Sequence, residues 1–307
     1  MNRRKEIAIV SSCNTKFVPH LAALFVSVLE NSDPKTFVRF YVVDDNIDAE
    51  SKKLLRFSVK NSRMNTDVEF LKINKEFFEN VVTSDRIPET AYYRIAIPEL
   101  FRGKNVERIL YMDCDMIALD DITKLWSLDF NGAIVAAIED AGFHRRLEKM
   151  EIPAKSMRYF NSGLMLINVE KWLEQDITHK VLKFIEENPQ KLRFHDQDAL
   201  NAILHDRWIA LHPKWNAQGY IMANAKKHPT AKGEKEYEEA RQNPSIIHFS
   251  GHVKPWSKDF KGLSKKYYEK YANMTAFRCV EKFPQYPLYA QVNRNRNRNR
   301  NRNTFVK

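Results

Sequence analysis

Cysteine is scarce in this chain, and long runs of apolar residues are missing. The 307 residues include three cysteines, too few for a disulfide framework, so we expect a reducing compartment. The apolar run Ile7–Val10 behind the basic N-terminus is too short for a signal peptide. The run Leu21–Leu29 is interrupted by Ser27 and cannot span a bilayer. We therefore expect a cytoplasmic protein.

Apolar residues make up 43% of the sequence, enough for one substantial core. Strand-like runs and helix-like patterns alternate along the first half, at Ile7–Ser11, Pro19–Leu29, Val38–Val43, Ala49–Lys60, Val68–Ile73, Ile109–Met112 and Ala133–Ile138. This alternation predicts an α/β fold with a parallel sheet and helices on both faces, where ligands bind at the carboxyl ends of the strands. Glu139 and Asp140 close the last of these strands, either as a polar strand end or as groups that face an acceptor.

Asp113 and Asp115 stand at the end of the predicted strand Ile109–Met112. Side chains two positions apart on a strand point to the same face, so the two carboxylates emerge side by side. Adjacent anions repel each other unless a cation lies between them, and a divalent metal shared with a substrate phosphate meets that need. A turn or a solvated loop carries the same Asp-x-Asp pattern, so the pair alone leaves both interpretations open.

A histidine in a second apolar strand offers a third metal ligand. His248 lies in the stretch Ile246–Trp256 and is followed by Gly251 and Lys254. Imidazole binds Mn²⁺-like metals, glycine lets backbone amides approach phosphate oxygens, and lysine neutralises phosphate as a point charge. The alternative is a core histidine beside a surface turn.

Two more polar motifs lie in apolar surroundings between these positions. Residues 161–163, Asn-Ser-Gly, open the apolar run Leu164–Asn168, which predicts another buried strand. Residues 195–198, His-Asp-Gln-Asp, open a helix, where Asp196 could be the N-cap and Asp198 a first-turn acid. Capping explains one of the two acids and leaves Gln197 without a role.

Together these motifs resemble glycosyltransferase family 8, and within it the bacterial lipopolysaccharide galactosyl- and glucosyltransferases. The likeness runs from about residue 6 to about residue 260. The motifs that carry it, in the family's order and approximate spacing, are Asp113-x-Asp115, Phe160–Gly163, Asp196–Asp198 and His248–Trp256. The resemblance implies a GT-A type, Rossmann-like fold with a mixed, mostly parallel sheet, a UDP-galactose or UDP-glucose donor, and Mn²⁺ or Mg²⁺ as cofactor. It also implies transfer with retention of configuration to a glycan, glycolipid or glycoprotein acceptor.

The resemblance also implies a role for each matching residue. Asp113, Asp115 and His248 would bind the metal, and Gly251 and Lys254 would hold the diphosphate. The other donor-binding positions that it implies are Ser12, Asn14, Arg94, Cys114, Asn161, Asp196 and Gln197. Gln197 would lie under the anomeric carbon, so Gln197 and Asp196 are the expected catalytic residues.

One stretch departs from the family pattern. After the first strand the loop reads Ser12–Lys16, with Asn14 where an aspartate is common and Lys16 where an asparagine is common. Asn14 can still hydrogen-bond a base edge, but it brings a donor as well as an acceptor. If this protein prefers a different nucleotide from the rest of the family, we expect Asn14 and Lys16 to be the cause.

The end of the chain differs in composition from the rest. Residues 263–292 are basic and aromatic at roughly helical spacing, which predicts a helical extension to a catalytic domain at 1–262. Residues 293–303 alternate Asn and Arg strictly, which predicts disorder for the tail 293–307. The five arginines of the repeat and Lys307 carry six of the +11 formal charges. The extension and tail are either a passive cap or a contact with the anionic inner face of a membrane.

Two other classes of protein fit parts of this sequence. A basic, non-enzymatic protein that binds nucleic acid or membrane would explain the tail. It leaves the strand-end carboxylates unexplained, since these repel phosphate backbones, and we expect no nucleic-acid partner. A phosphatase with an Asp-x-Asp nucleophile would use Asp113 and Asp115, but it gives no role to Asn161, Gln197 or His248.

Overall fold

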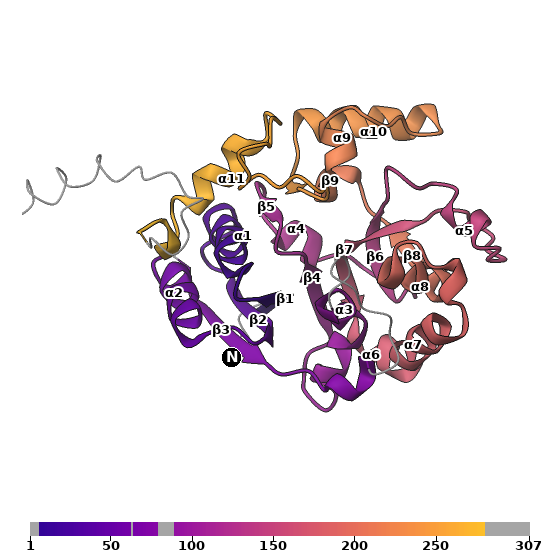
Figure 1. Ribbon diagram of the computed structural model, residues 1–307, viewed down its shortest axis with the longest axis horizontal. Helices are drawn as coiled ribbons and strands as arrows, with labels where there is room; N and C mark the ends of the chain where they lie inside the picture. Colours follow the sequence, from indigo (N-terminus) through magenta and orange to yellow (C-terminus); the bar gives the residue numbers. More distant parts are fainter. Residues whose placement is uncertain (1–5, 63, 79–88, 280–307) are drawn as a thin grey trace, which may run out of the picture.

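The computed structural model describes residues 6–62, 64–78 and 89–279, which build a central sheet with helices around it (Figure 1). The sheet has the strand order β3-β2-β1-β4-β7-β6-β8. Its strands are β1 Glu6–Asn14, β2 Phe37–Asp45, β3 Thr66–Leu71, β4 Arg108–Met112, β6 Val135–Glu139, β7 Phe160–Asn168 and β8 Trp208–Ala210. Strands β3, β2, β1 and β4 are parallel, whereas β7 runs antiparallel to both β4 and β6. The predicted mixed, mostly parallel α/β fold is confirmed.

Helices form two groups around the sheet. In one group α1 contacts both α2 and α11, and in the other α7 contacts α3, α6 and α8. The α-helices are α1 Val18–Asn31, α2 Ala49–Lys60, α3 Tyr93–Ala96, α4 Thr123–Trp126, α5 Arg146–Lys149, α6 Val169–Glu174, α7 Ile177–Glu187, α8 His195–Leu204, α9 Gly219–Met222, α10 Ala231–Gln242 and α11 Lys265–Ala272. Short 3₁₀ helices are η1 Lys75–Phe78, η2 Glu89–Ala91, η3 Ile97–Phe101, η4 Pro189–Lys191, η5 Pro213–Asn216 and η6 Ala276–Cys279. Within the described ranges, none of the helices combines the length and the apolar character needed to cross a bilayer.

Helix α1 is buried along nearly its whole length, which explains its run of apolar residues. Pro19 lies in the first turn, where its fixed φ suits a helix start. Ser27, which interrupts the apolar run, is fully buried. Its hydroxyl donates to Leu24 O at 2.6 Å and accepts from Ala118 N at 2.8 Å. The polar side chain is therefore satisfied, and it ties α1 to the strand that contains Ala118.

A second, three-stranded sheet stands at the carboxyl end of β4. Its order is β5-β10-β9, with β5 Met116–Ala118, β9 Ala217–Gln218 and β10 Ile246–His248. Strand β10 pairs antiparallel with β5, which places His248 opposite Met116. Since Met116 directly follows Asp115, this pairing brings a histidine from far along the chain to the two aspartates.

The first strand is longer than its apolar run predicts. Parallel pairing of β1 with β2 continues to the pair Asn14 and Asp45. Ser12 and Asn14 therefore lie in the end of the strand and not in a loop behind it. Backbone hydrogen bonds to β2 continue the strand into polar residues. A pattern of apolar side chains cannot reveal such an extension.

The C-terminal extension begins with α11, which packs on α1. Tyr268 and Tyr271 are buried in the main core together with Phe277. The hydroxyl of Tyr268 lies 2.7 Å from His20 Nδ1. These aromatic side chains face the protein, so they are not available to a membrane surface. The Asn-Arg repeat lies outside the described residues, and its disorder stays a prediction.

Candidate active site

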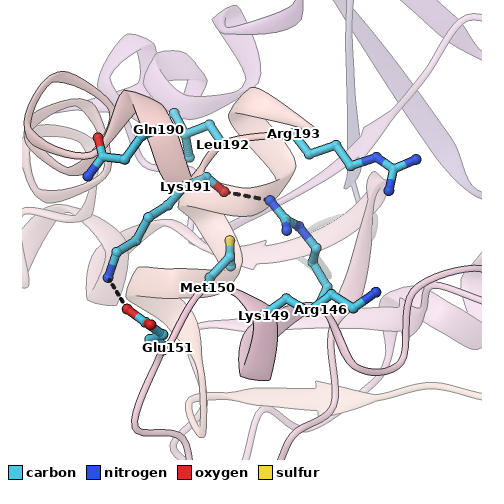
Figure 2. A pocket seen from close by; sticks show the side chains of 8 residues that line it. All are labelled: Arg146, Lys149, Met150, Glu151, Gln190, Lys191, Leu192 and Arg193. Atoms are coloured by element: carbon cyan, nitrogen blue, oxygen red, sulfur yellow. Dashed lines mark hydrogen bonds and ion pairs between the residues drawn. The ribbon is translucent and has the colours of Figure 1, made fainter.

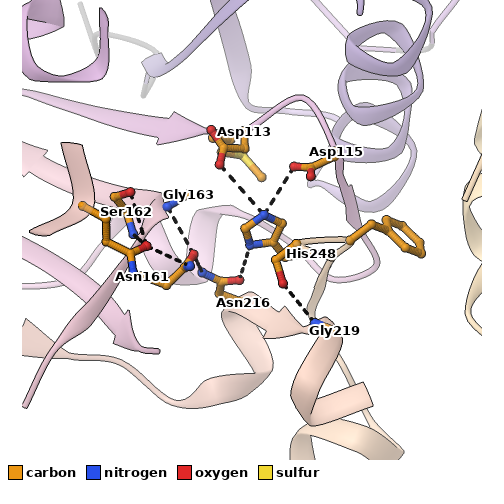
Figure 3. A network of polar contacts seen from close by, with 12 residues as sticks. Asp113, Asp115, Asn161, Ser162, Gly163, Asn216, Gly219 and His248 are labelled. Atoms are coloured by element: carbon orange, nitrogen blue, oxygen red, sulfur yellow. Dashed lines mark hydrogen bonds and ion pairs between the residues drawn. The ribbon is translucent and has the colours of Figure 1, made fainter. Parts of the chain in front are cut away.

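The three predicted metal ligands meet at the carboxyl end of β4 (Figure 3). His248 Nε2 lies 3.3 Å from Asp115 Oδ1 and 3.9 Å from Asp113 Oδ2. One ligand atom from each of the three side chains lies within 4.8 Å of the others. Two carboxylates and an imidazole form a donor set that suits Mn²⁺ and can also serve Mg²⁺. The site therefore fits one divalent cation.

Lys254 forms an ion pair with one of these carboxylates. Its ammonium lies 2.6 Å from Asp115 Oδ2 and donates to Phe249 O at 2.7 Å. Burial alone would raise the pKa of Asp115, but His248 and Lys254 lower it well below its usual value. Asp115 is thus ionised at neutral pH, as metal binding requires.

Arg94, on α3, links the metal-ligand aspartate to the start of α8. Its Nη2 lies 3.0 Å from Asp113 Oδ1 and its Nε 3.1 Å from Asp196 Oδ2. The guanidinium also lies over the ring of Tyr111, at 5.0 Å from the centroid. Burial lowers the pKa of Arg94, but Asp113 with its neighbours raises it above the usual value. Arg94 is therefore a fixed cation beside the candidate metal site.

The side-chain amides of Asn161 and Gln197 are held in one buried network. Gln197 Oε1 accepts from Ser162 N at 3.0 Å and from Asn161 Nδ2 at 3.1 Å. Both amide nitrogens donate to Asp140 Oδ2, at 3.0 Å from Gln197 and 3.2 Å from Asn161. Asp140, predicted only as a strand end or an acceptor-facing acid, is thus the common acceptor of two predicted sugar-binding residues.

The two acids of the motif at 196–198 serve different purposes. Helix α8 begins at His195 with Phe194 at its N-cap, so the interpretation of Asp196 as an N-cap is wrong. Asp196 faces the arginine of α3, and burial raises its pKa. Asp198 is fully buried and accepts from Arg146 Nε and Nη2 at 2.8 and 2.7 Å. The ion pair ties α5 to the first turn of α8, and Asp198 does not lie among the metal ligands.

A pocket of about 420 Å³ lies between α5 and η4, beside this buried ion pair (Figure 2). Basic side chains line much of it, with Arg146, Lys149, Lys191 and Arg193 among its walls. Arg146 is committed to the α8 aspartate, and Lys191 lies 3.6 Å from Glu151. None of the predicted donor-binding residues lines this pocket.

Four further predicted donor residues lie around the same sheet edge or on the loop behind β10. Ser12 and Asn14 end β1, which is the parallel neighbour of β4. Burial raises the pKa of Cys114, so its side chain is a neutral thiol and a poor metal ligand. Gly251 is exposed, and a Cβ there would meet nothing within 4 Å. Their contacts with a donor stay predictions.

A second cluster of ligand-type side chains, Glu139, His144 and His228, does not fit a metal. His228 Nδ1 accepts a hydrogen bond from Thr230 N at 3.1 Å, so the ring proton is on Nε2. That Nε2 faces Glu139 Oε2 at 3.3 Å. A protonated nitrogen has no free lone pair for a cation. His228 Nε2 therefore donates a hydrogen bond to Glu139 and does not bind a metal.

Two residues beside the metal ligands have no role assigned to them from the sequence. A Cβ on Gly163 would lie 2.5 Å from His248 Cε1 and 2.7 Å from Asp113 Oδ2, so only glycine fits. Asn216 is fully buried, and its Oδ1 lies 2.9 Å from His248 Nδ1. The alternation of apolar and uncharged polar residues in Trp215–Gln218 is a strand-like signal that could have drawn attention to it.

Comparisons with known proteins agree with this geometry. Residues 8–259 match the profile of "Glycosyl transferase family 8". "General stress protein A" of Bacillus subtilis (strain 168) is 43% identical over 281 residues, which cover 91% of this chain and 97% of that protein. "Lipopolysaccharide 1,2-glucosyltransferase" of Escherichia coli (strain K12) is 26% identical, over 75% of this chain and 67% of that protein.

The fold also matches a solved glycosyltransferase. The crystal structure of galactosyltransferase LgtC with donor and acceptor sugar analogues superposes with a TM-score of 0.76 at 23% identity. The match covers 88% of this chain and 96% of that one. It shows a shared GT-A architecture, and the profile match covers most of the chain. The chain therefore belongs to glycosyltransferase family 8.

Proposed function

We propose that this protein is a metal-dependent, retaining hexosyltransferase. It moves galactose or glucose from a UDP-sugar to a glycan, glycolipid or glycoprotein acceptor. The observation that carries the proposal is the meeting of Asp113, Asp115 and His248 at the carboxyl edge of the sheet. The family supports glycosyl transfer, and relatives named as lipopolysaccharide glucosyl- and galactosyltransferases support a hexose.

The charges around this point suit a diphosphate leaving group. Asp113, Asp115 and His248 would hold Mn²⁺, or Mg²⁺ in its place. When bound, the metal would supply Lewis-acid stabilisation of the diphosphate. Lys254 and Arg94 form ion pairs with Asp115 and Asp113, and they would stabilise the negative charge that grows on the departing phosphate.

Retention requires the acceptor to attack on the face from which UDP leaves. Gln197 Oε1 already accepts hydrogen bonds from Ser162 N and Asn161 Nδ2, and a neutral amide is a poor nucleophile. We therefore favour a front-side reaction in which the Gln197 amide stabilises an oxocarbenium-like sugar. Asp196 would orient the sugar while its own carboxyl is held by Arg94.

Release of UDP from UDP-galactose or UDP-glucose tests the donor and the metal. The protein should release UDP from one of these sugars in the presence of Mn²⁺, and EDTA or the variant Asp115→Asn should abolish release. Persistent activity in EDTA would contradict the metal assignment. Release of inorganic phosphate from phosphomonoesters, without use of UDP-sugars, would favour the phosphatase alternative.

The variant Gln197→Ala separates chemistry from donor binding. It should lower kcat much more than it weakens UDP binding, because in this proposal the amide lies beside the anomeric carbon and away from the nucleotide. Equal losses would make Gln197 a binding residue. An inverted linkage in the product, read by NMR of the anomeric proton, would exclude the retaining mechanism.

We also propose a cytoplasmic location and contact with the inner face of an anionic membrane. The support is the exposed lysines Lys266 and Lys270 of α11 and the arginine-rich residues 293–303 that follow later in the sequence. Removal of residues 293–307 should weaken cosedimentation with anionic liposomes at low salt and leave UDP release unchanged. If the full-length chain does not bind such liposomes, the membrane contact is wrong.

A further inference from the structure

We infer that the side chain of Tyr220 is a platform on which a pyranose ring of the acceptor stacks. Tyr220 stands at the start of α9, beside the turn that carries Asp140, and it is 39% exposed. The inference rests on the proposed transfer to a glycan and adds the residue that receives the acceptor. Tyr220 lies outside the four motifs that carry the family resemblance.

The start of α9 joins the two parts of the site between which an acceptor must enter. On one side, Gly219 N donates to Ser250 Oγ at 3.2 Å, in the loop proposed to hold the diphosphate. On the other side, Gln218 holds the turn after β6. Its Nε2 donates to Glu139 O at 2.8 Å, and its Oε1 accepts from Ala141 N at 3.0 Å. The backbone that carries Tyr220 is therefore fixed to both parts.

The ring of Tyr220 packs directly against this turn. A Cβ on Gly142 would lie 2.8 Å from Tyr220 Cε2 and 3.4 Å from Asp140 Oδ1, so the ring and the carboxylate are close neighbours. Asp140 Oδ1 accepts from Gly142 N at 2.9 Å. Its Oδ2 accepts from the side-chain amides of Asn161 and Gln197. The partly exposed ring thus borders the network that contains the proposed sugar-binding amides.

The proposed front-side reaction decides where the acceptor lies. Its hydroxyl must reach the anomeric carbon from the side of the leaving diphosphate, so it lies between the diphosphate loop and Gln197. Tyr220 belongs to the element that spans this gap. A pyranose has a flat face of C–H groups that packs well on an aromatic ring, while the tyrosine hydroxyl stays with water or the sugar hydroxyls.

Neighbouring side chains extend this aromatic surface. Phe143 meets Tyr220 edge to face, with the ring centroids 6.4 Å apart, and Phe194 lies 4.2 Å from Phe143. The ammonium of Lys226 lies 5.9 Å from the centroid of the Tyr220 ring. Its side chain is exposed and flexible, so a sugar can displace it. The turn therefore presents a small aromatic surface to solvent beside the reacting groups.

Binding of simple glycosides can be measured by saturation-transfer NMR. The probes are methyl β-galactopyranoside, methyl β-glucopyranoside and lactose, each with UDP and Mn²⁺ present and again without them. Sorbitol is the control ligand, because it carries similar hydroxyls but no rigid ring. We expect at least one glycoside to bind the wild type, with more saturation on the C–H protons of one ring face than of the other. Sorbitol should receive no saturation.

Variants assign the binding to the ring. Tyr220→Ala should weaken the glycoside at least about fivefold, as loss of one stacking contact does, and keep the affinity for UDP. Tyr220→Phe retains the ring and should bind like the wild type. Gly142→Ala places a methyl against the tyrosine, so the ring must shift and glycoside binding should weaken. Phe57→Ala is the matched control: it removes an exposed aromatic ring from α2 and should change neither affinity.

The outcomes separate this inference from the proposed function. Binding of a glycoside through Tyr220 without binding of UDP contradicts the proposed function alone. Binding of UDP without binding of any of the three glycosides overturns the inference, and so does an unchanged glycoside affinity in Tyr220→Ala. An equal loss of UDP affinity in that variant would make the ring a support of the site and would also overturn it. If Tyr220→Ala does not fold, as judged by circular dichroism, the glycoside affinity of Gly142→Ala decides.

Discussion

Replacing Lys254 by methionine should change the affinities for metal and for nucleotide in opposite directions. The ammonium of Lys254 lies 2.6 Å from Asp115 Oδ2, so a metal that binds Asp115 must share the carboxylate with this cation or displace it. Methionine keeps most of the length and the apolar stem but carries no charge. The substitution therefore removes a competitor for the metal and, at the same time, a partner for the diphosphate.

The size of the effect follows from the setting of the ion pair. Exposed pairs contribute about 0.2–1 kcal/mol, whereas breaking a buried pair costs about 3–5 kcal/mol. The Lys254 side chain is 26% exposed and that of Asp115 13%, so their pair lies between these limits. Without nucleotide, Mn²⁺ should bind Lys254→Met about 1–2 kcal/mol more tightly, or about five- to thirtyfold. The lost charged contact should weaken UDP by about 1.5–3 kcal/mol.

Calorimetry can measure both affinities on the same samples. Mn²⁺ is titrated into nucleotide-free protein, and UDP is titrated at saturating Mn²⁺. Lys258→Met is the matched control, because it removes the same charge from the same segment at an exposed position. It should leave both constants close to those of the wild type. A Lys254→Met variant that binds Mn²⁺ more weakly than the wild type would refute the competition between lysine and metal.

Three further changes test the packing and the electrostatics around the site. Gly163→Ala adds a methyl 2.5 Å from a ring carbon of the metal-ligand histidine; it should destabilise the fold by about 1–3 kcal/mol in urea unfolding and weaken Mn²⁺ binding. Asp198→Asn leaves Arg146, whose side chain is 11% exposed, without its counterion and should cost about 3–5 kcal/mol in the same assay. Backbone N–H groups lower the pKa of Asp206 from 3.8 to about 2, so its contribution to stability is present above the higher value and lost as the pH falls through the lower one. Asp206→Asn should flatten the pH dependence of unfolding in that window, and an unchanged slope would contradict this.

The metal ligands could be found in the sequence because their residue types are unusual where they stand. Carboxylates and an imidazole at the ends of apolar runs need a reason, and alternation along a strand predicts that Asp113 and Asp115 share one face. In the structure the two aspartates lie instead in the turn between β4 and β5, where both carboxylates face His248. The same spacing has the opposite consequence at Asp196 and Asp198. On a helix two positions turn by about 200°, so these side chains diverge. The motif therefore combines an acid that faces Arg94 with one that is buried against Arg146.

The network behind the ligands could not be predicted in the same way. Asn161, Asn216 and His248 lie on β7, η5 and β10, and their hydrogen bonds exist only once these elements pack together. Neutral amides also lack the charge that makes a buried carboxylate conspicuous. Asp140 was visible as a strand-end acid, but its partners were not, because the hydrogen bonds to it come from another strand and a helix.

The direction of β7 explains how motifs on opposite ends of their strands reach one site. Asp113 follows β4, whereas Asn161 and Gly163 stand at the start of β7. Because the two strands are antiparallel, the end of one lies beside the start of the other, with Met112 opposite Leu164. Asp113 N then donates to Gly163 O at 2.9 Å. A parallel β7 would carry its first residues to the start of β4, about 16 Å from Asp113 along the five residues of that strand. When one polar motif follows a strand and another precedes the next, a shared site therefore predicts an antiparallel pair.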